Sequence, residues 1–77
     1  MDMTIATPEG IVFEGQVESA KFPGASGAFM VLSRHAALIS ALTTGKIVYT
    51  TEGEAKELPI QGGFVEVKNN MISVCVE

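Results

Sequence analysis

The residues of this chain that could take part in catalysis are few, and they lie far apart in the sequence. His35 is the only histidine and Cys75 is the only cysteine. A catalytic histidine needs a nucleophile or a carboxylate as partner, and no residue near His35 in the sequence supplies one. We therefore expect His35 to be a structural or interface residue. Cys75 alternates with apolar residues and has no positive neighbour, which predicts a small, half-buried apolar residue.

Two further groups of residues have spacings that occur in binding sites. The segment Gly24–Gly27 resembles a phosphate-binding loop, but it lacks the Gly-Lys-Ser/Thr ending and precedes no expected helix, which favours a plain turn. The carboxylates of Glu52, Glu54 and Glu57 flank an expected hairpin and are interpreted as a solvated tip. One histidine and one cysteine cannot supply the roughly four ligands of a structural zinc site. The sequence therefore predicts no catalytic site, no cofactor and no metal site.

The size and charge of the chain restrict its class. Its 77 residues predict a single domain, 1–77, and 47% of them are apolar, which leaves some apolar surface for an interface. The net charge is −4 and there is no basic stripe, which argues against binding of nucleic acid or of anionic lipid. The scattered basic residues are Lys21, Arg34, Lys46, Lys56 and Lys68.

No segment predicts membrane insertion or export. The longest apolar runs have about five residues, far fewer than the ~20 that span a bilayer. The N-terminus has neither the positive start nor the apolar core of a signal peptide. We therefore expect a cytosolic compartment in which the single cysteine is reduced.

Short runs of Val, Ile, Thr and Phe, separated by Gly, Pro or Asn, must build the domain. This pattern predicts an all-β sandwich or flattened barrel of about 8–10 short, mostly antiparallel strands. The expected extended segments are Met3–Thr7, Ile11–Phe22, Ala28–Leu32, Ala37–Leu42, Lys46–Thr51, Ala55–Ile60, Phe64–Lys68 and Met71–Val76.

Two of these segments carry specific expectations. The apolar residues of Ile11–Phe22 change parity along the segment, which predicts a bulge or bend at Gly15 or Ser19. Ala28–Leu32 is apolar on both parities, which predicts a strand that is covered on both faces.

One further segment and the proline, glycine and asparagine residues near the strand ends also predict specific structures. Ala37–Leu42 fits either one helical turn or a strand, and we favour extended structure. Pro59 predicts an edge strand or a bulge, because proline cannot donate a ladder hydrogen bond. Gly62–Gly63 predicts a tight bend or a close backbone approach. Asn69–Asn70 predicts a left-handed turn between the last two strands.

Lys46 is the one residue that we consider as a candidate for covalent modification. Small acidic all-β domains include the biotinyl and lipoyl carriers, which present a modifiable lysine at the tip of a mid-chain hairpin. Lys46 follows a turn near mid-chain, but its context is Thr-Gly-Lys-Ile, whereas carriers show Met-Lys-Met or Asp-Lys. A carrier domain modified at Lys46 is the alternative function.

Three stretches of the chain carry a resemblance to a known family. They are Thr7–Ser19 (T-P-E-G-I-V-F-E-G-Q-V-E-S), Phe22–Gly45 (F-P-G-A-S-G-A-F-M-V-L-S-R-H-A-A-L-I-S-A-L-T-T-G) and Gln61–Val74 (Q-G-G-F-V-E-V-K-N-N-M-I-S-V). Together with their flanks, these stretches resemble the N-terminal β-sandwich domain of the epsilon subunit of the F-type ATP synthase over Thr4–Val76.

The resemblance implies a rotor subunit without an active site. Such a domain lies at the foot of the central stalk, packs against the gamma subunit, and rests on the c-ring, coupling proton or sodium flow to ATP synthesis. It is peripheral, on the cytoplasmic side of the plasma membrane, and associates with the membrane only through the complex. The residues that the resemblance turns toward the c-ring are Gly24, Ser26, Gly27, Ala28, Ser33, Arg34, His35 and Ala36.

The chain departs from the family pattern at two places in this set. The family usually has Pro-Gly-His-Ala-Pro where this chain has S-R-H-A-A from Ser33, and it often has an acidic residue in place of Ala28. We therefore hypothesise that Arg34 contacts a carboxylate of the ring.

Family members also commonly continue into a helical hairpin that inhibits hydrolysis or binds ATP. If the native chain ends at Glu77, we expect that regulation to be missing and only the coupling role to remain; if it continues, this inference does not hold.

Overall fold

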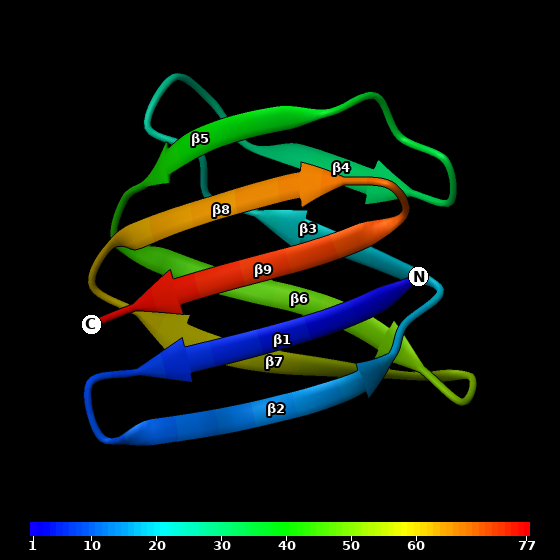
Figure 1. Cartoon of the computed structure of the whole chain (residues 1–77). Coiled ribbons are helices and arrows are strands. Elements are labelled where there is room, and N and C mark those ends of the chain that lie inside the picture. The colour runs from blue at the N-terminus through cyan, green and yellow to red at the C-terminus, as the bar shows by residue number, and fades with distance from the viewer.

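Nine short β-strands follow one another in the computed structural model, which describes residues 1–77 (Figure 1). The all-β class, the expected number of strands and both expected hairpins are confirmed. The chain contains no helix with the length and apolar character that crossing a membrane would require. The strands are β1 (Asp2–Thr7), β2 (Gly10–Gln16), β3 (Ser19–Phe22), β4 (Phe29–Leu32), β5 (Leu38–Leu42), β6 (Gly45–Thr51), β7 (Glu54–Ile60), β8 (Gly63–Lys68) and β9 (Met71–Val76).

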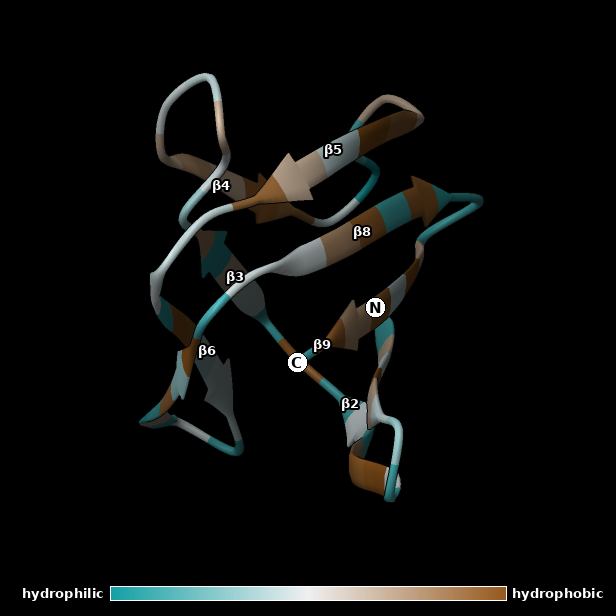
Figure 2. Ribbon diagram, turned by 90° about the vertical axis from the view of Figure 1, so that its left-hand side faces the viewer, coloured by the Kyte–Doolittle hydropathy of each residue, from teal (hydrophilic) through white to brown (hydrophobic).

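The strands form two sheets that pack face to face as a sandwich, seen from the side in Figure 2. One sheet has the order β2-β1-β9-β8-β5, and the other has the order β4-β3-β6-β7. Neighbouring strands are antiparallel except for β1 and β9, which run parallel. Because Asp2 pairs with Met71 and Ala6 with Cys75, this parallel pair joins the two ends of the chain within one sheet.

The core between the sheets is built from alternate residues, because successive side chains of a strand point to opposite faces. On β9, Ile72, Val74 and Val76 are buried, whereas the residues between them are exposed. Phe22 and Ile47 of the other sheet belong to the same cluster of 16 buried apolar residues. Burial of each large apolar side chain contributes roughly 1.5–3 kcal/mol, so this cluster holds the two sheets together.

The predicted break within Ile11–Phe22 is present, but its position was wrong. β2 ends before Val17–Glu18 in one sheet, and β3 begins after it in the other sheet. The change in apolar parity therefore reflects a crossing between sheets at Val17–Glu18, and not a bulge at Gly15 or Ser19.

The prediction that Ala28–Leu32 is covered on both faces was also wrong. On β4 only Val31 is buried, while Met30 and Leu32 are 52% and 55% exposed. The sandwich has only two layers, so every strand keeps one face toward solvent. Apolar residues on both parities of β4 therefore produce an exposed apolar face.

The predictions for Ala37–Leu42, Pro59 and Asn69–Asn70 were confirmed. Ala37–Leu42 is extended and contains β5. Pro59 lies on β7, which is an edge strand of the four-stranded sheet. Asn69 and Asn70 have φ angles of 52° and 60°, and they form the left-handed turn between β8 and β9.

Gly63 is the point of close backbone approach, and this leads to a stability prediction. Its φ is +147°, and a Cβ built there would overlap the Cys75 carbonyl oxygen and lie 2.9 Å from the Val76 Cα. Gly10 has a similar φ of +137° but open space around it. We expect Gly10→Ala to lower the free energy of unfolding by about 1–3 kcal/mol through backbone strain alone. Gly63→Ala should cost several kcal/mol more, because backbone atoms must also move.

Urea denaturation of both variants measures this difference. Equal losses for Gly63→Ala and Gly10→Ala would contradict the close approach of β8 to β9 at this point.

Candidate docking site

The turn Gly24–Ala28 connects β3 to β4 and is attached to the end of β5. The backbone amide of Ala25 donates to the carbonyl of Ala41 at 2.9 Å, and Gly24 forms an isolated bridge with Leu42. Gly24 is buried, whereas the four residues after it are exposed. The turn therefore presents a small, uncharged tip on a fixed base.

The corner Ser33–Ala36 connects β4 to β5 and is held by backbone hydrogen bonds. The amide of His35 donates to the carbonyl of Leu32 at 3.1 Å, and the amide of Arg34 donates to Oδ1 of Asn70 at 3.0 Å. His35 is partly buried, and its Nδ1 donates to the carbonyl oxygen of Ala36 at 2.7 Å. The histidine ring is thus engaged with the local backbone, which is compatible with the expected structural or interface role.

Arg34 occupies a backbone conformation that favours glycine. Its φ is +64°, in the left-handed region, where a side chain costs roughly 1–2 kcal/mol. The residue is exposed and takes part in no salt bridge; the one in this chain joins Lys46 to Glu57 at 3.3 Å. The corner therefore holds an unpaired guanidinium on a rigid, hydrogen-bonded loop.

The turn and the corner lie at opposite ends of β4, as Figure 1 shows. Four residues of strand separate them by roughly 13 Å at a rise of about 3.3 Å per residue. The structure thus brings the predicted residues together as two groups, not one. Both groups adjoin the edge strands β4 and β5, so a single partner can touch both only by lying along that edge.

Lys46 lies outside this region and does not have the setting of a carrier lysine. It is the second residue of β6 and lies opposite Pro59 of the neighbouring strand β7. Its side chain forms a salt bridge with Glu57. The tip of that hairpin is Glu52–Gly53. Lys46 is therefore not presented at a hairpin tip as a carrier lysine is, which argues against the carrier alternative, whereas Glu52, Glu54 and Glu57 are solvent-exposed as predicted.

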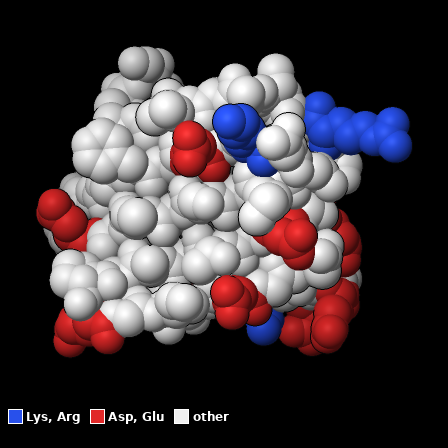
Figure 3. All heavy atoms as spheres, viewed as in Figure 1, with Lys and Arg blue, Asp and Glu red and all other residues white.

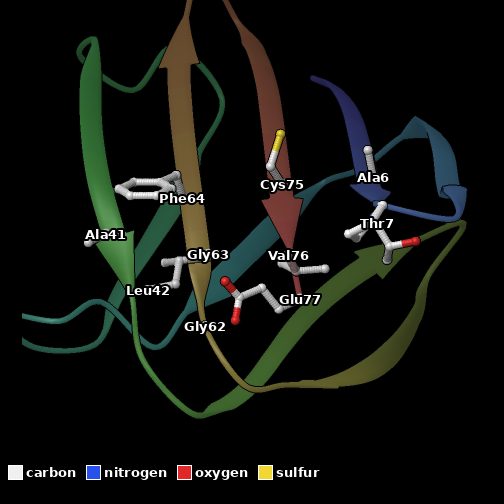
Figure 4. Close-up of a pocket in the computed structure, with 11 residues that line it drawn as sticks. Ala6, Thr7, Ala41, Leu42, Gly62, Gly63, Phe64, Cys75, Val76 and Glu77 are labelled. Atoms are coloured by element: carbon white, nitrogen blue, oxygen red, sulfur yellow. The ribbon is translucent and has the colours of Figure 1, made fainter.

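An apolar groove on the five-stranded sheet was not predicted from the sequence. It lies where β1, β5 and β9 end and β8 begins (Figure 4). Phe64 and Cys75 face it from neighbouring strands, and Ala6 and Ala41 flank them. Cys75 is exposed, so its predicted half-buried state was wrong, because nothing in the chain covers this face. No three His, Cys, Asp or Glu side chains are grouped so that they could hold a metal ion.

The chain matches over residues 1–77 the family described as ATP synthase, Delta/Epsilon chain, beta-sandwich domain. It belongs to this family. A relative named ATP synthase epsilon chain from Endomicrobium trichonymphae is 40% identical over 76 residues, which are 99% of this chain and 55% of that one. Another of that name, from Nitratiruptor sp., is 40% identical over 78 residues, covering 100% of this chain and 60% of the relative. The chain thus spans little more than half the length of these relatives.

Chains in two solved ATP synthase assemblies share the fold. A chain in the central stalk and c-ring of the Tetrahymena thermophila mitochondrial ATP synthase superposes with a TM-score of 0.82 at 18% identity, covering 99% of this chain and 62% of that chain. A chain in the Euglena gracilis mitochondrial ATP synthase superposes with a TM-score of 0.90 at 19% identity, covering 96% of this chain and 48% of that chain. The family resemblance read from the sequence is confirmed.

The geometry of Arg34 leads to a second stability prediction. Arg34→Gly removes the left-handed strain and adds chain entropy to the unfolded state, so we expect the free energy of unfolding to rise by about 0.5–1 kcal/mol. Ser33→Gly is the matched control, because Ser33 has no positive φ and should lose stability. Thermal and urea unfolding measure both changes. A loss of stability in Arg34→Gly would mean that the arginine side chain makes a stabilising contact within the domain.

Proposed function

We propose that this domain is a non-catalytic part of the rotor of an F-type ATP synthase, docked on the gamma subunit and the c-ring. In this role it couples proton or sodium flow to ATP synthesis, and it is peripheral on the cytoplasmic side of the membrane. The observation that carries the proposal is the match of the entire chain to the Delta/Epsilon β-sandwich family. It is supported by the structural neighbours, one from an assembly described as central stalk and c-ring and the other from an assembly of OSCP, F1 and c-ring.

The proposed mechanism is mechanical. A part that transmits torque must resist deformation, and close-packed interiors do so because their side chains cannot move independently. The core of this domain is one apolar cluster without a buried polar side chain, and β1 and β9 join the chain ends within one sheet. The sandwich can therefore move as a unit between two partners.

The proposed c-ring contact uses the turn Gly24–Ala28 and the corner Ser33–Ala36, with the ring lying along the β4 edge between them. The turn contributes Gly24, Ser26, Gly27 and Ala28, and the corner contributes Ser33, Arg34, His35 and Ala36. Arg34 is the one charge among them, and its planar guanidinium suits a carboxylate of the ring. The rigid backbone of the corner reduces the entropy lost when this contact forms.

The test is assembly with partners from the same organism. We expect the domain and the gamma subunit to elute as a 1:1 complex in size exclusion, and the complex to bind detergent-solubilised c-ring. Arg34→Glu should weaken ring binding at least tenfold at low salt, since a repulsion replaces an attraction. Lys56→Glu, a charge reversal on the remote strand β7, is the matched control and should leave ring binding unchanged.

Two results would contradict the proposal at different levels. Failure of the folded domain and gamma to form a complex would remove the rotor assignment. Equal ring affinities of the Arg34→Glu and Lys56→Glu variants would remove the charge contact of Arg34 while leaving the rotor assignment in place.

A further inference from the structure

The corner Ser33–Ala36 lies where the chain crosses from one sheet to the other. β4, which precedes the corner, is an edge strand of the four-stranded sheet, and β5, which follows it, is an edge strand of the five-stranded sheet. The two strands pair with other neighbours and not with each other. Because no ladder joins β4 to β5, the position of the corner depends on the few other contacts that it makes.

One hydrogen bond joins the corner to a distant part of the chain. The amide of Arg34 donates to Oδ1 of Asn70, which is 36 residues away in the sequence. The other two hydrogen bonds of the corner are local, from the His35 amide to Leu32 and between the His35 ring and Ala36. Figure 1 shows the turn between β8 and β9, which contains Asn70, beside the corner. Asn70 is therefore the only hydrogen-bonded anchor of the corner outside the β4–β5 connection.

Asn70 is itself held firmly in the five-stranded sheet. Lys68 pairs with Met71 across the turn, and the carbonyl of Asn70 accepts the amide of Asp2 at 3.3 Å. The φ of Asn70 is 60°, a left-handed conformation that asparagine adopts more readily than most residues. The backbone of Asn70 is thus joined to β1 and its side chain to the corner. A force on the corner therefore reaches the inner strands β1 and β9 as well as the edge strand β5.

The two proposed docking loops are held in different ways. The turn Gly24–Ala28 is attached through main-chain bonds, from the amide of Ala25 to the carbonyl of Ala41 and from the amide of Gly27 to the carbonyl of Gly24. Main-chain bonds of this kind do not depend on which side chains are present. The corner is attached through the side chain of Asn70, so its placement depends on the identity of that one residue.

The anchor acts on the residue that carries the charge. Arg34 has a φ of +64° and relaxes toward an ordinary conformation unless the surroundings prevent it. The bond to Asn70 keeps the Arg34 amide turned toward the β8–β9 turn and so fixes the direction from which the guanidinium projects. Figure 3, in the view of Figure 1, shows basic side chains at the end of the molecule where Figure 1 places the corner, one of them extended well beyond the surface.

We propose that Asn70 is a positioning residue for docking, which holds Arg34 in its left-handed conformation and presents the guanidinium to a carboxylate of the partner. The role in ring binding rests on the proposed function, whereas the anchor is a property of this domain alone. Without the anchor, the corner would have to become ordered during binding. The apparent affinity then falls by the fraction of time that the corner spends in the docking conformation.

Amide hydrogen exchange in the isotope-labelled chain tests the anchor. In Asn70→Gly, which keeps the left-handed backbone and removes Oδ1, the Arg34 amide should exchange roughly two- to tenfold faster, the effect of one net hydrogen bond. Asn69→Gly is the matched control, because Asn69 is the other left-handed residue of the same turn and does not bond to the corner. Asn70→Asp retains an acceptor oxygen and should restore the original rate.

Two results decide the anchor. Equal Arg34 exchange rates in Asn70→Gly and Asn69→Gly would overturn it. The amides of β9 should exchange at unchanged rates in all three variants, and faster exchange there in Asn70→Gly would overturn a local role in favour of support for the whole sheet.

Binding of the gamma complex to detergent-solubilised c-ring tests the positioning role. Asn70→Gly should weaken ring binding by roughly two- to tenfold, and Asn69→Gly should not. The same substitutions are then made together with Arg34→Ala, which removes the guanidinium and keeps the backbone amide. In that background Asn70→Gly should have no further effect, because the group that it positions is absent.

The outcomes separate the positioning role from the proposed function. Equal losses of ring affinity from Asn70→Gly with and without Arg34→Ala would overturn positioning in favour of structural support. A released Arg34 amide with unchanged ring affinity would overturn positioning and leave the ring contact in place. Failure of the unmodified complex to bind the ring would remove the proposed ring contact and the positioning role with it, while amide exchange would still decide the anchor.

Discussion

The constraint on which this structure depends is that a two-layer sandwich buries one face of each strand and leaves the other face in water. The chain meets it with inward residues such as Ile5, Phe22 and Val74, which are almost entirely inaccessible to solvent. The side chains on the outer face of a strand are then not constrained by packing in the core. The outward residues of β4 and β8 are therefore available to bind a partner.

The outer faces of the two sheets differ in polarity. The four-stranded sheet has charged residues on its central strands, whereas the five-stranded sheet has an apolar row bordered by carboxylates. Strand register forms this apolar row from Ile11, Ala6, Cys75, Phe64 and Ala41. The loops at the ends of β4 add a third kind of surface, small and uncharged at the Gly24–Ala28 turn and cationic at Arg34. A domain with three such surfaces around one rigid core is suited to hold several partners in a fixed arrangement.

Local features of the fold could be predicted from the sequence, because single residues determine them. Asn69–Asn70 favours a left-handed turn, Pro59 is restricted to an edge or a bulge, and Gly63 permits a close approach, whatever the rest of the chain does. The opposite positions of the turn and the corner were also within reach, since a strand lies between them in the sequence.

Surface properties could not be predicted in the same way. The exposure of Cys75 and Met30 was missed because alternation gives the parity of a residue and not whether another layer covers that face. The apolar row was missed because its residues become neighbours only through the register of five strands. The crossing at Val17–Glu18 looked like a bulge because both features shift the parity of the apolar residues.

The parallel pairing of β1 with β9 has a consequence for how the domain is made. β1 is synthesised before the other eight strands, yet one of its two neighbours in the sheet, β9, is the last of the nine strands to be made. Until β9 emerges, β1 has only β2 beside it, and an isolated hairpin is marginally stable in water. The five-stranded sheet can therefore close only after translation has passed Val76, and the nascent chain must keep Met3 and Ile5 from other contacts until then.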